Sequence, residues 1–88
     1  MAEEINNTYR IATNLNNIGT VYANKPSTID RALDYYLKAL PLFKELDYSA
    51  GIGIASMNIG ETYFKKEMYD SALSFFETSV KIYEGTID

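Results

Sequence analysis

The chain contains no cysteine, no histidine and no tryptophan, and only two prolines among its 88 residues. Without cysteine there is no disulfide, and without cysteine or histidine the usual zinc ligands are missing. The same absences exclude thiol nucleophiles, imidazole acid–base chemistry and the Ser-His-Asp arrangement. The sequence therefore predicts no metal site, no cofactor and no enzymatic activity.

The remaining candidates for chemistry are pairs of carboxylates and one glycine pair. Glu3 and Glu4 are adjacent, and Glu45 and Asp47 are two positions apart, but nothing in the sequence around either pair predicts a pocket or a raised pKa. Gly51-Ile52-Gly53 lacks the preceding strand and the following Lys-Ser/Thr of a phosphate-binding loop. We interpret the carboxylates as solvated surface and the glycine pair as a hinge between two units.

Positive charge is scarce, since 8 Lys and Arg stand against 12 Asp and Glu, for a net charge of -4. This balance has the wrong sign for a nucleic-acid-binding surface. The chain opens with Met1-Ala2-Glu3-Glu4, which is unlike a signal peptide, and no apolar run approaches the roughly 20 residues of a membrane span. We expect a cytoplasmic protein that binds neither nucleic acid nor membranes.

The sequence contains an internal repeat. An offset of 41 aligns Asn17-Ile18-Gly19 with Asn58-Ile59-Gly60, and further along an offset of 40 aligns Tyr35-Tyr36 with Phe75-Phe76. The one-residue difference falls at 24–28, where turn-forming residues absorb an insertion most easily. Two copies of one unit therefore account for nearly the whole chain.

Each copy predicts two helices, because its apolar residues recur at helical spacing and never alternate as in a half-buried strand. In the first copy these residues are Ile11, Leu15, Ile18 and Tyr22, then Ile29, Leu33, Tyr36, Leu40 and Phe43. In the second they are Ile52, Ala55, Ile59 and Tyr63, then Tyr69, Leu73, Phe76, Val80 and Tyr83. We expect an all-α protein of four antiparallel helices. It forms one domain over residues 1–88, with repeat one at about 8–47 and repeat two at about 49–84.

Glycine inside a helix costs roughly 0.5 to 1 kcal/mol relative to alanine, so Gly19 and Gly60 favour a close helix crossing at each. Each follows an isoleucine and precedes an aromatic by three residues; after the turn comes an alanine, then an aromatic four residues later. The residues are Ile18, Gly19, Tyr22, Ala32 and Tyr36, and again Ile59, Gly60, Tyr63, Ala72 and Phe76. This pattern resembles the tetratricopeptide repeats, in a variant longer than the usual unit of about 34 residues.

The resemblance covers roughly residues 8–84 and implies two tandem helix-turn-helix units, a right-handed α-solenoid fragment, acting as a protein–protein interaction module. Such repeats bind a peptide or partner segment in a concave groove lined by the first helix of each unit. Carried over, the groove positions are Asn16, Asn17, Thr20, Asn24, Met57, Asn58, Glu61, Phe64 and Lys65. Only Lys65 is basic, so we expect no clamp for a terminal carboxylate.

Asn17 and Asn58 are the most informative of these residues. An asparagine amide offers an acceptor and donors, so it can bond the backbone of an extended peptide whatever that peptide's side chains are. The alternative is that both are solvated polar residues that match only because the two copies share ancestry.

The last helix predicts a second surface. We expect an apolar face there, of the kind that a following repeat covers in longer arrays; its residues are Ala72, Phe75, Ser79 and Ile82. Because about three repeats are normally needed for stability, three outcomes stay open. The chain is a piece of a longer array, or it pairs with itself, or it exchanges repeats between protomers. We favour self-association as a homodimer, which makes a structural assembly element the alternative function.

Overall fold

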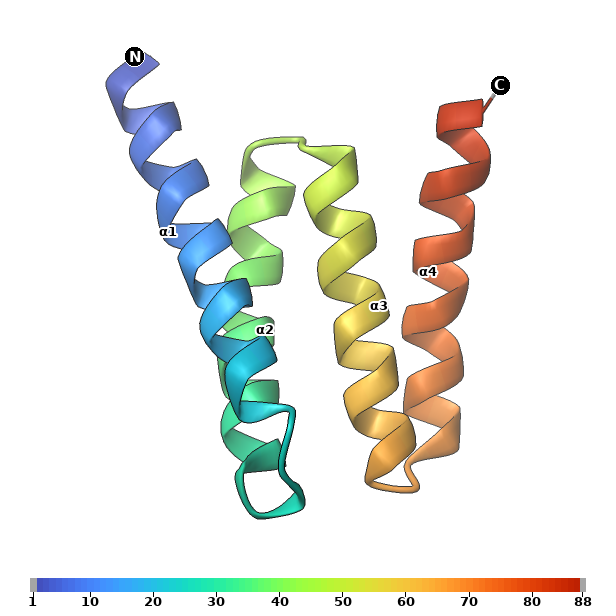
Figure 1. Cartoon of the computed structure of the whole chain (residues 1–88). Coiled ribbons are helices and arrows are strands. Elements are labelled where there is room, and N and C mark those ends of the chain that lie inside the picture. Colours follow the sequence, from blue (N-terminus) through green and yellow to red (C-terminus); the bar gives the residue numbers. More distant parts are fainter. Residues whose placement is uncertain (1, 88) are drawn as a thin grey trace.

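The computed structural model describes residues 2–87, and these residues form helices joined by turns, as expected for an all-α protein. The elements are α1 (Ala2–Tyr22), the short 3-10 helix η1 (Pro26–Thr28), α2 (Ile29–Glu45), α3 (Ser49–Lys65) and α4 (Tyr69–Ile87). Figure 1 shows two hairpins, α1–α2 and α3–α4, side by side; the link between them lies at the end where the chain begins and finishes. Within the described range, none of the helices has the length and apolarity needed to span a membrane.

Within each hairpin the two helices cross at a glycine. A Cβ added to Gly19 would lie 2.7 Å from the ring of Tyr36 and 3.2 Å from the carbonyl oxygen of Ala32. A Cβ added to Gly60 would lie 2.7 Å from the ring of Phe76 in the same way. The prediction that these glycines mark close helix crossings is therefore confirmed.

The two hairpins pack together through α2 and α3, and the main core is built from residues of α1, α2 and α3. Its buried residues are Ala12, Ala32, Tyr36, Ala39, Leu40, Phe43, Ala55 and Ile59. Gly51 and Gly53 are buried within α3, and a Cβ on Gly51 would overlap the ring of Phe43. The interpretation of Gly51-Ile52-Gly53 as a hinge is therefore wrong. Both glycines lie within α3, and their lack of a side chain leaves room for Phe43 of α2 and Ile82 of α4.

Two of the three turns share one geometry. Asp47 and Glu67, which follow α2 and α3, adopt left-handed backbone conformations with φ of 53° and 63°. The backbone N–H groups of Tyr48 and Met68 then donate to carbonyls five residues earlier, at 3.0 and 2.9 Å. This is the Schellman motif, which satisfies carbonyls left free at a helix end. Both helices therefore end in the same way and reverse the chain within three residues.

Candidate protein-binding surfaces

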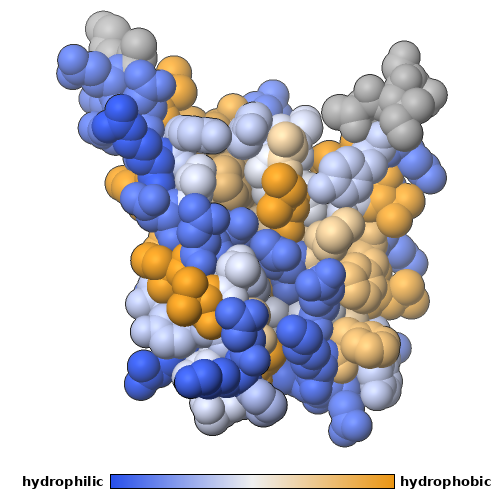
Figure 2. Space-filling model, in the orientation of Figure 1, coloured by the Kyte–Doolittle hydropathy of each residue, from blue (hydrophilic) through white to orange (hydrophobic). Residues whose placement is uncertain are grey.

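Polar side chains from α1 and α3 meet on one surface of the molecule. Asn58 donates from Nδ2 to Oδ1 of Asn16 at 3.3 Å, so the bond joins the two repeats. Figure 2 shows that hydrophilic residues dominate the surface over α1 and between α1 and α3. The bond leaves the Asn16 amide N–H groups and the Asn58 Oδ1 atom as a donor and an acceptor side by side.

Thr20 belongs to the same surface, but its hydroxyl already makes two hydrogen bonds within the protein. It donates to the backbone carbonyl of Asn16 at 3.1 Å and accepts a hydrogen bond from the Tyr36 hydroxyl at 3.1 Å. Burial raises the pKa of Tyr36, the hydrogen bond with Thr20 lowers it, and the nearby Glu61 charge raises it. Tyr36 therefore remains a neutral donor beneath the groove at physiological pH.

The other expected groove residues fall into two sets. Asn17, Asn24, Met57 and Glu61 are exposed, as a binding surface requires. Phe64 is also exposed; its ring meets Tyr69 of α4 edge-on, with centroids 5.4 Å apart, and it lines a hollow with Glu61, Lys65 and Phe76. The structure therefore places Phe64 between the expected groove residues Glu61 and Lys65 and the surface of α4.

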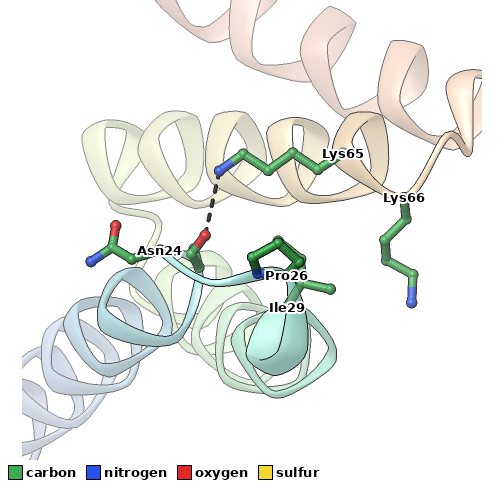
Figure 3. Close-up of a pocket in the computed structure, with 6 residues that line it drawn as sticks. Asn24, Pro26, Ile29, Lys65 and Lys66 are labelled. Carbon is green, nitrogen blue, oxygen red and sulfur yellow. Dashed lines mark hydrogen bonds between the residues drawn. The ribbon is translucent and has the colours of Figure 1, made fainter.

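A pocket of about 420 Å³ lies where the first turn approaches the end of α3. The residues lining it are Ala23, Asn24, Pro26, Ile29, Lys65 and Lys66. Lys65 donates from Nζ to the carbonyl oxygen of Ala23 at 3.4 Å, and Lys66 forms an ion pair with Asp30. Figure 3 shows the Lys65 side chain reaching over toward the first turn, while Lys66 points away from the end of α3 beyond Pro26 and Ile29.

The sequence prediction missed Pro26, Ile29 and Lys66. The available signal was the one-residue insertion in the first turn, which was interpreted only as a place where a loop tolerates extra length. In the structure the longer turn contains η1, and the Thr28 hydroxyl donates to the Tyr22 carbonyl at 2.6 Å. The insertion therefore forms one wall of a pocket.

The apolar face expected on α4 is wrongly placed. Ala72 and Ser79 are only 2% and 1% exposed, and the Ser79 hydroxyl donates to the Gly53 carbonyl at 3.1 Å. Phe75 stacks on Tyr63 with ring centroids 5.8 Å apart, and a Cβ on Gly53 would lie 3.2 Å from Ile82. The set Ala72, Phe75, Ser79 and Ile82 thus packs against α3, because its small residues allow the close approach of that helix.

A different apolar stripe of α4 is partly exposed. We define the α4 stripe as Leu73, Phe76, Val80 and Tyr83. Leu73 and Val80 are 57% and 52% exposed, and Figure 2 shows hydrophobic residues gathered over α4. The equivalent residues of α2, forty positions earlier, are Leu33, Tyr36, Leu40 and Phe43. Those residues lie in or against the core, whereas in the α4 stripe Phe76 packs against Gly60 and Leu73 and Val80 are exposed.

Two consecutive helical hairpins of the same design define the class of protein as a tandem helical repeat. The chain belongs to the tetratricopeptide repeat family, because the sequence model described as tetratricopeptide repeat matches residues 10–85. Repeats of this family are generally non-catalytic modules for protein–protein interaction. No curated protein and no solved structure matches the chain.

Proposed function

We propose that this protein binds an extended peptide segment of a partner protein on the surface between α1 and α3, without catalysing a reaction. The observation that carries the proposal is the hydrogen bond between Asn58 and Asn16. It leaves one donor group and one acceptor facing the same surface, which matches the alternating carbonyl and N–H groups of a peptide backbone. We also propose a cytoplasmic location, since a chain without cysteine gains nothing from an oxidising compartment.

The test starts from a peptide selected by display against the intact protein, with affinity measured by fluorescence anisotropy. Asn16→Ala combined with Asn58→Ala should weaken binding about tenfold, because each lost hydrogen bond contributes about 0.5 to 1.5 kcal/mol. The matched control is Asn6→Ala with Asn7→Ala, which removes two exposed amides near the start of α1 and should leave the affinity unchanged. Equal affinity in both double variants would contradict the proposal.

The second candidate is a structural role in which the protein self-associates through the α4 stripe. What favours it is that Leu73 and Val80 of this stripe are 57% and 52% exposed, whereas Leu40, the equivalent of Val80 in α2, is only 7% exposed. The stripe has spacings of 3, 4 and 3 residues, which read the same in both directions. Two antiparallel copies of α4 therefore pair Leu73 with Tyr83 and Phe76 with Val80 around a two-fold axis.

Head-to-tail stacking of copies fits this surface less well. In that arrangement α1 of one copy covers the α4 stripe of the next, as α3 covers α2. Gly51 and Ala55 are buried in α3, but the equivalent residues of α1, 41 positions earlier, are the exposed Arg10 and Asn14. In the head-to-tail arrangement Arg10 would take the place of Gly51 and collide with Tyr83, the equivalent of Phe43. The two-fold arrangement is therefore the one that we propose.

Light scattering coupled to size exclusion at high micromolar concentration tests this candidate. Val80→Glu should convert a dimer to a monomer, because it places a charge at the centre of the apolar contact. Val21→Glu on α1 is the matched control, since Val21 is 67% exposed and lies outside the stripe. A wild-type monomer, or a dimer that survives Val80→Glu, would rule out the assembly role.

A further inference from the structure

We propose that the pocket beside the first turn is a subsite for one aliphatic side chain of the bound peptide, with an adjacent carboxylate pairing with Lys65. The inference rests on the proposed peptide-binding function and adds the chemistry of the partner. The partner segment thus contains an aliphatic residue next to Asp or Glu.

The pocket has room for part of a peptide, and its wall is preorganised. Its volume of about 420 Å³ lies in the lower part of the range of roughly 300 to 1,000 Å³ for ligand pockets, which accommodates an aliphatic side chain together with the neighbouring acidic residue. Pro26 and Ile29 provide an apolar wall (Figure 3). The Thr28 hydroxyl, bonded to the Tyr22 carbonyl at 2.6 Å, holds the turn that carries them. The wall is therefore in place before a ligand arrives, which lowers the entropy lost on binding.

The charge beside this apolar wall comes from Lys65. Lys66 is paired with Asp30, whereas Lys65 bonds a neutral carbonyl, that of Ala23, at 3.4 Å. This distance is long for a hydrogen bond, and an ammonium group has three donors. Lys65 can therefore bind a carboxylate while it keeps its contact with the Ala23 carbonyl. In a protein with a net charge of -4, this pocket is a local exception that favours an acidic ligand.

The pocket is also in reach of a peptide bound at the asparagines. Ala23 lies seven residues after Asn16, and Lys65 lies seven residues after Asn58. Seven helical residues rise about 10 Å, which an extended peptide covers with about three residues. The aliphatic residue is thus expected about three positions from the peptide residue that pairs with the Asn16–Asn58 amides.

Fluorescein-labelled peptides of defined sequence test the subsite, with anisotropy measured up to millimolar protein. The probe is Gly-Ser-Leu-Asp-Ser-Gly, and its two variants replace Leu by Ala or Asp by Asn. A fourth peptide, Gly-Ser-Ser-Leu with a free carboxyl end, distinguishes a side-chain carboxylate from a terminal one. We expect the Leu-Asp probe to bind and each replacement to weaken binding at least fivefold. Absence of binding by the Leu-Asp probe overturns the proposal.

A double-mutant cycle assigns the carboxylate to its partner. Lys65→Gln should weaken binding of the Leu-Asp probe at least fivefold and leave the weaker Leu-Asn peptide unaffected. Lys81→Gln, at an exposed lysine of α4, is the control and should change neither affinity. Equal effects of Lys65→Gln on both peptides overturn the proposed pairing.

The selected peptide used to test the groove separates the two proposals. If its affinity falls with the Asn16 and Asn58 substitutions but not with Lys65→Gln, the subsite is refuted and the groove function stands. If the reverse holds, the groove function fails and the pocket remains as a separate site.

Discussion

At the scale of single residues, glycines determine how closely the helices of this protein approach. The close helix crossings at Gly19 and Gly60 could be predicted from the sequence, because glycine inside a helix lowers its stability and is expected there only where close packing requires it. Gly51 could not, since two glycines close together are equally typical of a flexible link. The deciding contact is with Phe43, which precedes Gly51 by eight residues and reaches it only after the chain reverses.

Two alanine substitutions should therefore have opposite effects. Gly51→Ala should lower the free energy of unfolding by about 1 to 2 kcal/mol, because overpacking against the buried Phe43 ring outweighs the gain in helix propensity. Gly85→Ala should raise it by about 0.5 kcal/mol, because no atom lies within 4 Å of the added Cβ. Urea denaturation of the three proteins measures both changes. A Gly51→Ala variant as stable as wild type would show that the α2–α3 contact is looser than described.

At the scale of helices, periodicity locates apolar stripes but does not say which neighbour each one faces. α4 has two adjacent stripes, and the sequence alone led to the wrong one as the exposed face. The repeat itself contained the correct information, because Ala32 and Ala39, the equivalents of Ala72 and Ser79, are small residues that suit the inside of a close helix pair.

The ends of the helices provide a prediction at this scale. Glu67 has a φ of 63°, and a left-handed conformation costs a non-glycine residue roughly 1 to 2 kcal/mol. Glu67→Gly should stabilise the protein by about 0.5 to 1 kcal/mol after the greater freedom of glycine in the unfolded chain is subtracted. The control is Glu77→Gly within α4, which should destabilise by about 1 kcal/mol. Thermal unfolding followed by circular dichroism compares the two, and a loss of stability in Glu67→Gly would contradict the assigned turn.

At the scale of the whole molecule, the internal repeat was enough to predict the class of fold and the order of the helices. The resemblance to the tetratricopeptide repeats also placed Asn16 and Asn58 in the same expected groove, although their direct bond depends on how α1 and α3 pack. The pocket was not predictable in this way, because it forms where the two copies differ. An insertion of one residue in the first turn brings Pro26 and Ile29 opposite the end of α3.

The central claim is that a partner peptide lies between α1 and α3. The most direct measurement is a ¹H–¹⁵N correlation spectrum of the labelled protein during titration with the display-selected peptide, in which asparagine side-chain amides are observed individually. We predict that the side-chain resonances of Asn16, Asn17 and Asn58 shift together with the neighbouring backbone amides of α1 and α3. Shifts confined to α4 around Leu73 and Val80, with the three asparagine amides unchanged, would contradict the claim.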